Sequence, residues 1–241
     1  MNHKNKKKKE RKLISGIYNL IDGSMTQQLR FETIANNMAN SNTNGFKKDI
    51  ISFSEALETQ SNSSTDFSQG PLKYTGNELD VALSSKGFFK IETPNGIRYT
   101  RDGAFSINSQ GVLVTGNGDT VLGENGPITA EGGEVYIGRD GQVVVNNESV
   151  DKILVVDFDE PQLLRKEGGS YYSYQGENKG ISTAPDAEIQ QKYLESSNVN
   201  PTQETIQMIE TYRAFESVEK AIQSIDALTN EMVNDYGTVP N

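Results

Sequence analysis

The sequence contains no cysteine and no tryptophan, and its single histidine, His3, lies in a lysine-rich run at the N-terminus. Without cysteine the chain cannot form disulfides, thiolate metal sites or a cysteine nucleophile. One histidine in a terminal run also excludes a Ser-His-Asp triad and a multi-histidine metal site from the rest of the chain. These absences remove many enzyme classes before any motif is considered.

Positive charge is scarce after the first twelve residues. Residues 1–12 carry a net charge of +6 and the whole 241-residue chain carries −10, so residues 13–241 carry −16. An acidic body of this kind is not attracted to nucleic acid by its overall field. We interpret residues 1–12 as a disordered, solvated basic tail.

Long apolar runs are also missing. No stretch approaches the roughly 18 apolar residues of a membrane-spanning helix, so we expect no transmembrane segment. The run that follows the lysines, residues 13–21, is broken by polar residues, and no small-residue cleavage site comes after it. We therefore expect no cleavable signal peptide.

Glycine is rare at both ends of the chain and common in the middle. Of 22 glycines, 18 fall between Gly70 and Gly180. Glycine is unfavourable inside helices and useful in tight turns, so this distribution predicts helical ends and a middle of strands and turns.

The N-terminal segment, residues 13–40, has helical periodicity. Its apolar residues recur at steps of three and four along one face: Ile14, Tyr18, Ile21, Met25 and Leu29, continued by Ile34, Ala35 and Met38. This spacing predicts an amphipathic helix. The polar run 41–44 ends the pattern, and we expect Gly45 to be the C′ glycine of the helix.

The C-terminal segment predicts a long helix over residues 201–236. Asn200 can cap it and Pro201 suits its first position. Apolar residues follow at Met208, Tyr212, Phe215, Val218, Ile222, Ile225, Leu228 and Met232. Their mean spacing is close to the 3.5 residues of a coiled-coil seam. A helix of this length spans about 54 Å and needs a partner along its length.

The region between the helices is divided into a linker, residues 46–69, and a β-rich domain, residues 70–189. The small polar residues at 59–66 are typical of a flexible loop. Beyond them, short β-type runs alternate with turn signals, which favours antiparallel strands. We interpret Asp102-Gly103 and Asp140-Gly141 as hairpin turns rather than calcium loops. We expect strands at 79–83, 88–91, 112–114, 135–137, 142–145 and 153–156.

The predicted fold class is α+β, with N- and C-terminal amphipathic helices paired as a coiled-coil-like arm and an antiparallel β-rich domain inserted between them. The helical domain combines residues 13–45 with 190–236, and residues 237–241 form a tail. An isolated helix pair is marginally stable, whereas packing against other chains stabilises it. We expect assembly contacts at apolar positions of both helices: Ile21, Met25, Leu29, Met38, Met208, Phe215, Ile222 and Ile225.

No group of residues combines a nucleophile, a base and an orienting side chain, so we predict no enzyme, no metal and no cofactor. Asp157, Asp159 and Glu160 are interpreted as an exposed strand end. The tyrosines at 171, 172 and 174 could stack on sugars, or could belong to a tyrosine-rich β edge. They leave a secreted carbohydrate-binding or adhesive β protein as an alternative function.

Four blocks of the sequence resemble the axial proteins of the bacterial flagellum, the family that builds its rod and hook. Residues 35–47 resemble the ANN-A-N-NT-GFK signature of that family. The other blocks, in family order, are 74–83 with 87–89, 99–105 with Asn108 and 111–115, and 194–200 with 208–209 and 213–216. Together they span most of residues 15–236. The residues that carry the family motif are Asn36, Asn37, Asn40, Asn42, Thr43, Gly45, Phe46, Asp102, Gly103, Asn198 and Asn200.

The resemblance implies a structural subunit of the basal-body rod, the drive shaft that transmits torque for motility. It implies partners among related rod and hook proteins, further copies of the chain and the flagellar type III export apparatus, and a place in the periplasmic rod. Phe215 within the block 213–216, the modest length and the short tail favour the proximal-rod type over the distal-rod type. The motif residues up to Gly45 would fix the end of the first helix and the exit of the chain.

Overall fold

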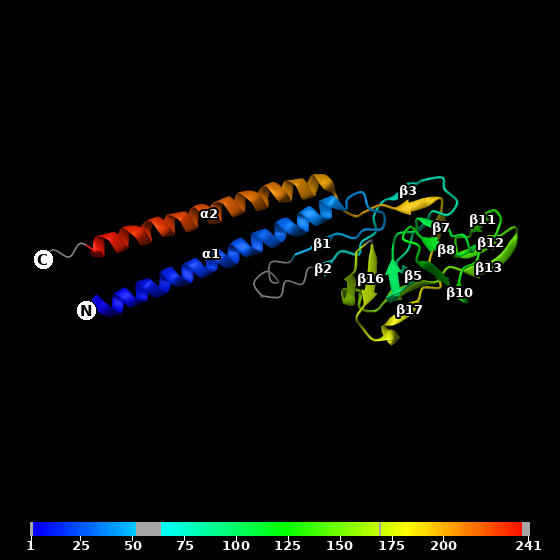
Figure 1. Cartoon of the computed structure of the whole chain (residues 1–241), viewed down its shortest axis with the longest axis horizontal. Coiled ribbons are helices and arrows are strands. Elements are labelled where there is room, and N and C mark those ends of the chain that lie inside the picture. The colour runs from blue at the N-terminus through cyan, green and yellow to red at the C-terminus, as the bar shows by residue number, and fades with distance from the viewer. Residues whose placement is uncertain (1, 52–63, 169, 238–241) are drawn as a thin grey trace. The chain divides into compact units, whose positions relative to one another are not determined.

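The computed structural model describes residues 2–51, 64–168 and 170–237, which fall into two compact units (Figure 1). The helical unit comprises residues 1–38, 49–64 and 200–241, and the β unit comprises residues 39–48 and 65–199. The chain therefore passes between the units at 38/39, 48/49, 64/65 and 199/200.

The helical unit is built on α1 (Asn2–Ala39) and α2 (Pro201–Gly237). Figure 1 shows the N-terminus of α1 and the C-terminal end of α2 at the same end of this unit. The disordered basic tail expected at residues 1–12 differs from the structure, because α1 begins at Asn2. Lysine, arginine and glutamate are good helix formers, and no glycine or proline interrupts this segment.

The helix expected at residues 201–236 is confirmed by α2, and its start follows from local chemistry. Asn200 Oδ1 accepts hydrogen bonds from the backbone N–H groups of Thr202 (3.1 Å) and Gln203 (3.2 Å). This side chain therefore satisfies donors that lack a partner inside the helix. Pro201 occupies the first turn, where its missing N–H removes no helical bond.

The less exposed face of α2 follows steps of four and three, the 3.5-residue spacing of a coiled-coil seam. Its members are Glu204, Met208, Thr211, Phe215, Val218, Ile222, Ile225 and Thr229. Tyr212, which the sequence placed in this seam, is 58% exposed, and the buried Thr211 takes its position. A hydrogen bond from Asn37 Nδ2 to Glu204 Oε2 (3.5 Å) joins the two helices. Coiled-coil pairing along their length remains a prediction.

On α1, the predicted apolar stripe is divided: Tyr18, Ile21 and Met25 are exposed, whereas Ile34, which the sequence placed in the same stripe, lies on the buried face. Tyr18 and Met25 are 63% and 62% exposed, whereas Ile34 and Asn37 are buried. At 100° per residue Ile34 lies on the opposite side of the helix from Tyr18 and Met25, and Asn37 lies about 100–120° from them. The exposed part of the stripe is therefore available for contacts outside the unit. The side chains of Ile14, Leu228 and Met232 lie outside what the structure describes.

The rest of the described structure consists mainly of short strands. Some of them pair with the next strand in the sequence, and others pair with strands far away in the sequence. The strands are β1 (Asp49–Ile50), β2 (Ser64–Thr65), β3 (Leu72–Tyr74), β4 (Val81–Leu83), β5 (Phe88–Thr93), β6 (Gly96–Thr100), β7 (Phe105–Ile107), β8 (Leu113–Thr115), β9 (Thr120–Gly123), β10 (Gly126–Pro127), β11 (Val135–Ile137), β12 (Gln142–Val145), β13 (Glu148–Lys152), β14 (Val155–Phe158), β15 (Leu164–Lys166), β16 (Tyr171–Tyr174), β17 (Ile181–Thr183), β18 (Ile189–Gln191) and β19 (Tyr193–Glu195). Two 3₁₀ turns, η2 (Pro161–Leu163) and η3 (Asn178–Gly180), lie among them.

A ten-stranded sheet forms the centre of the β unit, with the path β15-β16-β6-β5-β9-β8-β7 and with β10, β14 and β17 attached to it. The pairings along this sheet are antiparallel, as the sequence predicted; in the β5–β6 hairpin, for example, Phe89 lies opposite Thr100. Beside it, β11, β12 and β13 form a three-stranded sheet. The pairs β18-β4 and β19-β3 bring strands near the end of the chain back to strands near the start of the unit.

Two turn predictions had different outcomes. Asp140-Gly141 connects the paired strands β11 and β12, so the hairpin is confirmed. Asp102-Gly103 was wrongly interpreted as a hairpin turn, because β6 and β7 lie at separate places in the sheet and do not pair. Gly103 instead accepts a hydrogen bond at its carbonyl from Val81 N (3.0 Å). A Cβ on Gly103 would overlap the Val81 carbonyl, so glycine allows this close approach.

The β unit has two hydrophobic clusters. The larger one centres on aliphatic strand residues such as Val81, Ile91 and Val121, and the second is mainly aromatic. The predicted strand at 153–156 is shifted, since β14 covers Val155–Phe158 while Ile153 bridges to Gly123. Within the described residues, neither helix has a segment long and apolar enough to cross a membrane.

The linker expected at residues 46–69 is not a separate segment where the structure describes it. Residues 46–48 and 65–69 belong to the β unit, and Phe46 and Lys47 are buried there. A lysine is rarely buried unless its charge is paired, and the partner of Lys47 lies too far away in the sequence for a local pattern to reveal it. The part of the expected loop at 59–63 lies outside the described residues.

Candidate functional site

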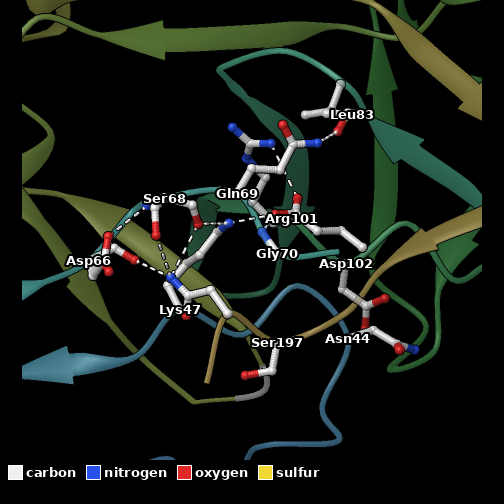
Figure 2. Close-up of polar contacts among 12 residues, drawn as sticks. Asn44, Lys47, Asp66, Ser68, Gln69, Gly70, Leu83, Arg101, Asp102 and Ser197 are labelled. Atoms are coloured by element: carbon white, nitrogen blue, oxygen red, sulfur yellow. Dashed lines mark hydrogen bonds and ion pairs between the residues drawn. The ribbon is translucent and has the colours of Figure 1, made fainter. Parts of the chain in front are cut away.

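A buried ion network joins four parts of the β unit that are distant in the sequence: Glu195 and, labelled in Figure 2, Lys47, residues 68–70 and Arg101. The Glu195 carboxylate lies 2.5 Å from Lys47 Nζ through Oε1 and 3.2 Å from Arg101 NH1 through Oε2. The same Oε1 accepts a hydrogen bond from Gly70 N (2.8 Å), and Lys47 Nζ also donates to Ser68 O (2.7 Å). Sequence analysis missed this network, although Lys47 and Glu195 lie within two of the family-like blocks.

Burial governs the electrostatics of the network. It lowers the pKa of Lys47 and of Arg101 below their ordinary values, because removal from water penalises the charged forms. The negative charge of Glu195 and its hydrogen bonds oppose this effect for both groups. One carboxylate therefore compensates two cations, and the remaining polar groups around it supply hydrogen bonds.

Gly45 lies at the point where the chain from α1 meets this network. Its φ of +65° and its contact with the backbone of Arg101 and Asp102, which a Cβ would overlap, both require glycine. Its N–H donates to the Glu195 carbonyl (2.8 Å). The prediction of Gly45 as a helix C′ residue was wrong, since α1 ends at Ala39; tertiary packing, not capping, is the reason for this glycine.

The Asn198 side chain forms hydrogen bonds to two other segments, at Lys48 and at residues 66–68. Its Oδ1 accepts the Lys48 N–H (2.7 Å), and its Nδ2 donates to Asp66 O (2.8 Å) and to Ser68 O and Oγ (3.1 and 3.2 Å). Asp66 in turn donates its N–H to Lys48 O (2.9 Å). Burial raises the pKa of Asp66, but hydrogen bonds from Ser68 and the charge of Lys48 outweigh it, so the net direction is downward.

Two asparagines of the first motif make hydrogen bonds within their own compact unit. Asn37 mimics a strand partner for Asp49, since its Oδ1 accepts the Asp49 N–H and its Nδ2 donates to Asp49 O, both at 2.9 Å. Asn40 Oδ1 accepts the Thr43 hydroxyl (3.2 Å) in the turn after α1. Asn36 and Asn42 are exposed.

The remaining motif residues are packed in the β unit. Phe46 is buried, with Lys166 Nζ 4.3 Å from its ring centroid. Asp102 Oδ1 accepts the Ala104 N–H (3.1 Å), and burial raises the Asp102 pKa above its ordinary value. The structure therefore brings Gly45, Phe46, Asp102, Gly103 and Asn198 into the β unit, where they fix the course of the backbone.

The eight expected assembly residues fall into two groups. Ile21 and Met25 are exposed on the outward stripe of α1. The other residues are half-buried on the two helices: Leu29, Met38, Met208, Phe215, Ile222 and Ile225. On α2, sequence reasoning missed the exposed apolar residues Ile206 and Ile209, which with Tyr212 lie near the start of the helix. Their spacing of three residues was the available signal.

The tyrosines that suggested a sugar-binding platform are not arranged as one. Tyr172 is fully buried, and Tyr171 shares a hydrogen bond with Thr115 through its hydroxyl (2.6 Å). Tyr174 packs on Phe158, with 4.8 Å between ring centroids. Tyr172 is packed in the aromatic cluster, and Tyr171 and Tyr174 are half-buried, so the three rings do not form an exposed stacking surface. Because β16 lies between β15 and β6, the interpretation as a sheet edge is also wrong.

Asp159 and Glu160 are exposed between β14 and η2, and Asp157 is half-buried in β14. This is the exposed strand end that the sequence suggested.

Comparison with known families places similarity along most of the chain. The model described as "Flagella basal body rod protein" matches residues 17–47, "Flagellar hook protein FlgE/F/G D1 domain" matches 82–145, and "Flagellar basal body rod FlgEFG protein C-terminal" matches 190–234. The first match covers the motif at residues 35–47, which spans the end of α1, and the last covers Glu195, Asn198 and most of α2.

Three relatives illustrate the similarity over the full length. The flagellar basal-body rod protein FlgF of Caulobacter vibrioides is 35% identical, over 93% of this chain and 99% of the relative. FlgG of Buchnera aphidicola is 32% identical, over 87% and 95%, and FlgG of Bacillus subtilis is 29% identical, over 92% and 99%.

Proposed function

The chain belongs to the flagellar basal-body rod protein family, and on that premise we propose that its helical unit supplies the contacts that assemble it into the rod. As a member of the family it is a structural subunit of the flagellar basal body, where rod proteins assemble with other axial proteins. Similarity to a rod protein over nearly the whole length of both chains is the observation that carries this conclusion.

Exposed apolar side chains on both helices support the proposed contacts. Tyr18, Ile21 and Met25 on α1 and Ile206 and Ile209 on α2 are each more than two-fifths exposed. Full burial of an aliphatic or methionine side chain contributes about 2 kcal/mol. Several such contacts per subunit are enough to favour association. Because an axial contact of this kind joins different surfaces, it extends into a helical filament rather than closing into a dimer.

The half-buried seam of α2 completes the proposal. Phe215, Ile222 and Ile225 occupy alternating coiled-coil positions that retain partial exposure. We assign them to pairing with α1 and to the edges of contacts with neighbouring subunits. Met208 on α2, and Leu29 and Met38 on α1, have the same intermediate burial and the same assignment.

The proximal-rod type is part of the proposal, supported by Phe215 within the block 213–216. The relatives carry both names, FlgF and FlgG, at similar identities, so the subtype rests on that block. Export through the flagellar type III apparatus and a periplasmic position are also part of the proposal. The helical unit would lie in the core of the rod, with other rod and hook proteins as its neighbours.

Substitution of one seam residue tests the proposal. In cells that depend on this chain, Ile222→Asp is expected to abolish rod assembly and swimming, because it places a charge in an apolar contact. The purified variant should keep the melting transition of its β unit. Gln223→Asp adds the same charge at the adjacent exposed position and should swim normally. Normal swimming by Ile222→Asp, with rods present in purified basal bodies, would overturn the assembly role of the helices.

A further inference from the structure

The chain crosses between the two units at four points, and three short parts of the β unit lie next to three of these crossings. We call them the exit segments: residues 44–48, which precede the 48/49 boundary, residues 65–70, which follow the 64/65 boundary, and residues 194–199, which precede the 199/200 boundary. They come from distant parts of the sequence, yet each bonds to both of the others.

Each exit segment is anchored by a side chain packed in the β unit. Phe46 is buried in the first, and Val199 is buried in the third. Phe67 in the second makes edge-on contacts with Phe88 and Tyr172, both with ring centroids 5.6 Å apart. The segments are therefore part of the packed unit and not loose connections.

Two side chains of the third segment cross-link all three. Asn198 bonds to Lys48 in the first segment and to Asp66 and Ser68 in the second. Glu195, three residues earlier, bonds to Lys47 in the first segment and to Gly70 in the second. Arg101 then connects Glu195 to the central sheet.

Main-chain bonds run between the same segments. Gly45 N donates to Glu195 O (2.8 Å), Asn198 N donates to Phe46 O (3.3 Å), and Asp66 N donates to Lys48 O (2.9 Å). A single hydrogen bond adds little to stability, whereas bonds that link the same three segments are broken together. Displacement of one segment therefore requires the others to give way.

We propose that Glu195 and Asn198 join the three exit segments into one mechanical clamp, through which force applied to the helices enters the β unit at three fixed points together. Its use in carrying torque rests on the proposed function, whereas the clamp itself is a property of the single chain. Without it, force would enter through one segment and peel the β unit strand by strand. With it, the unit resists until the whole clamp breaks.

Pulling single molecules of the full chain tests the clamp directly. The chain lacks cysteine, so two introduced cysteines give unique handles. Ile50→Cys with Thr202→Cys loads the first and third segments, and both positions are exposed just beyond the exits. The parent protein should extend in one high-force event of about 50 nm, the length of the intervening residues at about 3.5 Å each. Asn198→Ala should lose this single event and show an early partial extension at lower force.

Asn125→Ala is the matched control. Asn125 is also an asparagine of the β unit, with its Nδ2 bonded to Asp151 (3.0 Å), but it lies in none of the exit segments. This control should keep the single event. An unchanged force and pattern in Asn198→Ala would overturn the proposal, as would an equal loss in Asn125→Ala.

Asn198→Asp serves as a milder variant that keeps the acceptor for Lys48 N and removes the donors to Asp66 and Ser68. With handles at Ser64→Cys and Thr202→Cys it should lose the single event, whereas with the handles at 50 and 202 it should keep most of the force. Equal behaviour with both handle pairs would overturn the assignment of the bonds. Rod assembly by the Ile222→Asp chain, measured separately, tests the proposed function and does not bear on the clamp.

Discussion

The carboxylate of Glu195 and the ammonium of Lys47 lie 2.5 Å apart, and neither side chain has any exposed surface. They are 148 residues apart in the sequence. Because both side chains are fully buried, water cannot solvate either charge when its partner is removed. Each charge is therefore stabilised by the other. A change of charge at either residue is thus expected to destabilise the β unit.

Glu195→Ala is expected to destabilise the β unit by about 3–5 kcal/mol, because it leaves Lys47 and Arg101 buried without a counter-charge. Urea unfolding followed by near-UV circular dichroism, which reports the packed tyrosines, measures this loss. The control is Glu124→Ala, which removes a partly exposed ion pair with Lys152 at 3.9 Å and should change stability by less than about 0.5 kcal/mol. Similar losses in the two variants would contradict the dominant role of the buried network.

Asp102 gives a pH dependence of opposite sign to that of an ordinary paired carboxylate. Burial raises its pKa above the model-compound value of 3.8. Between 3.8 and the raised value, the folded protein binds more protons at this site than the unfolded chain, so this site lowers stability as the pH rises. Asp102→Asn keeps an acceptor for Ala104 N but cannot titrate. The variant should gain stability relative to the parent through this window and keep a constant difference above it.

Urea unfolding of both proteins at a series of pH values from below 3.8 to 7 measures that difference. A difference in stability that does not change with pH would show that the Asp102 carboxylate has the same pKa in the folded and unfolded states.

Gly45→Ala is expected to cost at least about 3 kcal/mol, since the new Cβ combines an unfavourable positive φ with overlap of the Arg101–Asp102 backbone. Gly118→Ala is the control, because Gly118 also has a positive φ (+86°) but a Cβ there meets open space. That substitution should cost about 1 kcal/mol. Chemical unfolding of both variants separates the packing cost from the backbone cost, and equal losses would refute the packing argument.

Met25→Asp is expected to leave the isolated protein within about 0.5 kcal/mol of the parent, because Met25 is 62% exposed. In cells it should reduce the number of rods, since the charge falls on the outward stripe of α1. Asn19→Asp adds a charge at an exposed polar position of the same helix and should assemble normally. Counting rods in purified basal bodies measures the effect. Normal assembly by Met25→Asp would show that the outward stripe of α1 is not part of the assembly interface.

Local features of this fold could be derived from the sequence because their causes lie within a few residues. Periodicity and the Asn200 cap located α2, and the placement of glycine separated the β-rich region from the helices. The Asp140-Gly141 hairpin needs only a turn and its flanking strands. The family-like blocks also identified Gly45 and Asn198 as special positions before their contacts were visible.

The sequence by itself thus determined the α+β class, α2, the Asp140-Gly141 turn and the family, since these depend on spacing and on short motifs. Only the tertiary structure decided which face of α1 is exposed, because an apolar stripe can pack within its own chain or against another. It also decided the roles of Lys47, Glu195 and Arg101, whose charges are compensated across 94 and 148 residues. Pairing over such separations depends on how the sheets fold the chain back, which no local pattern encodes.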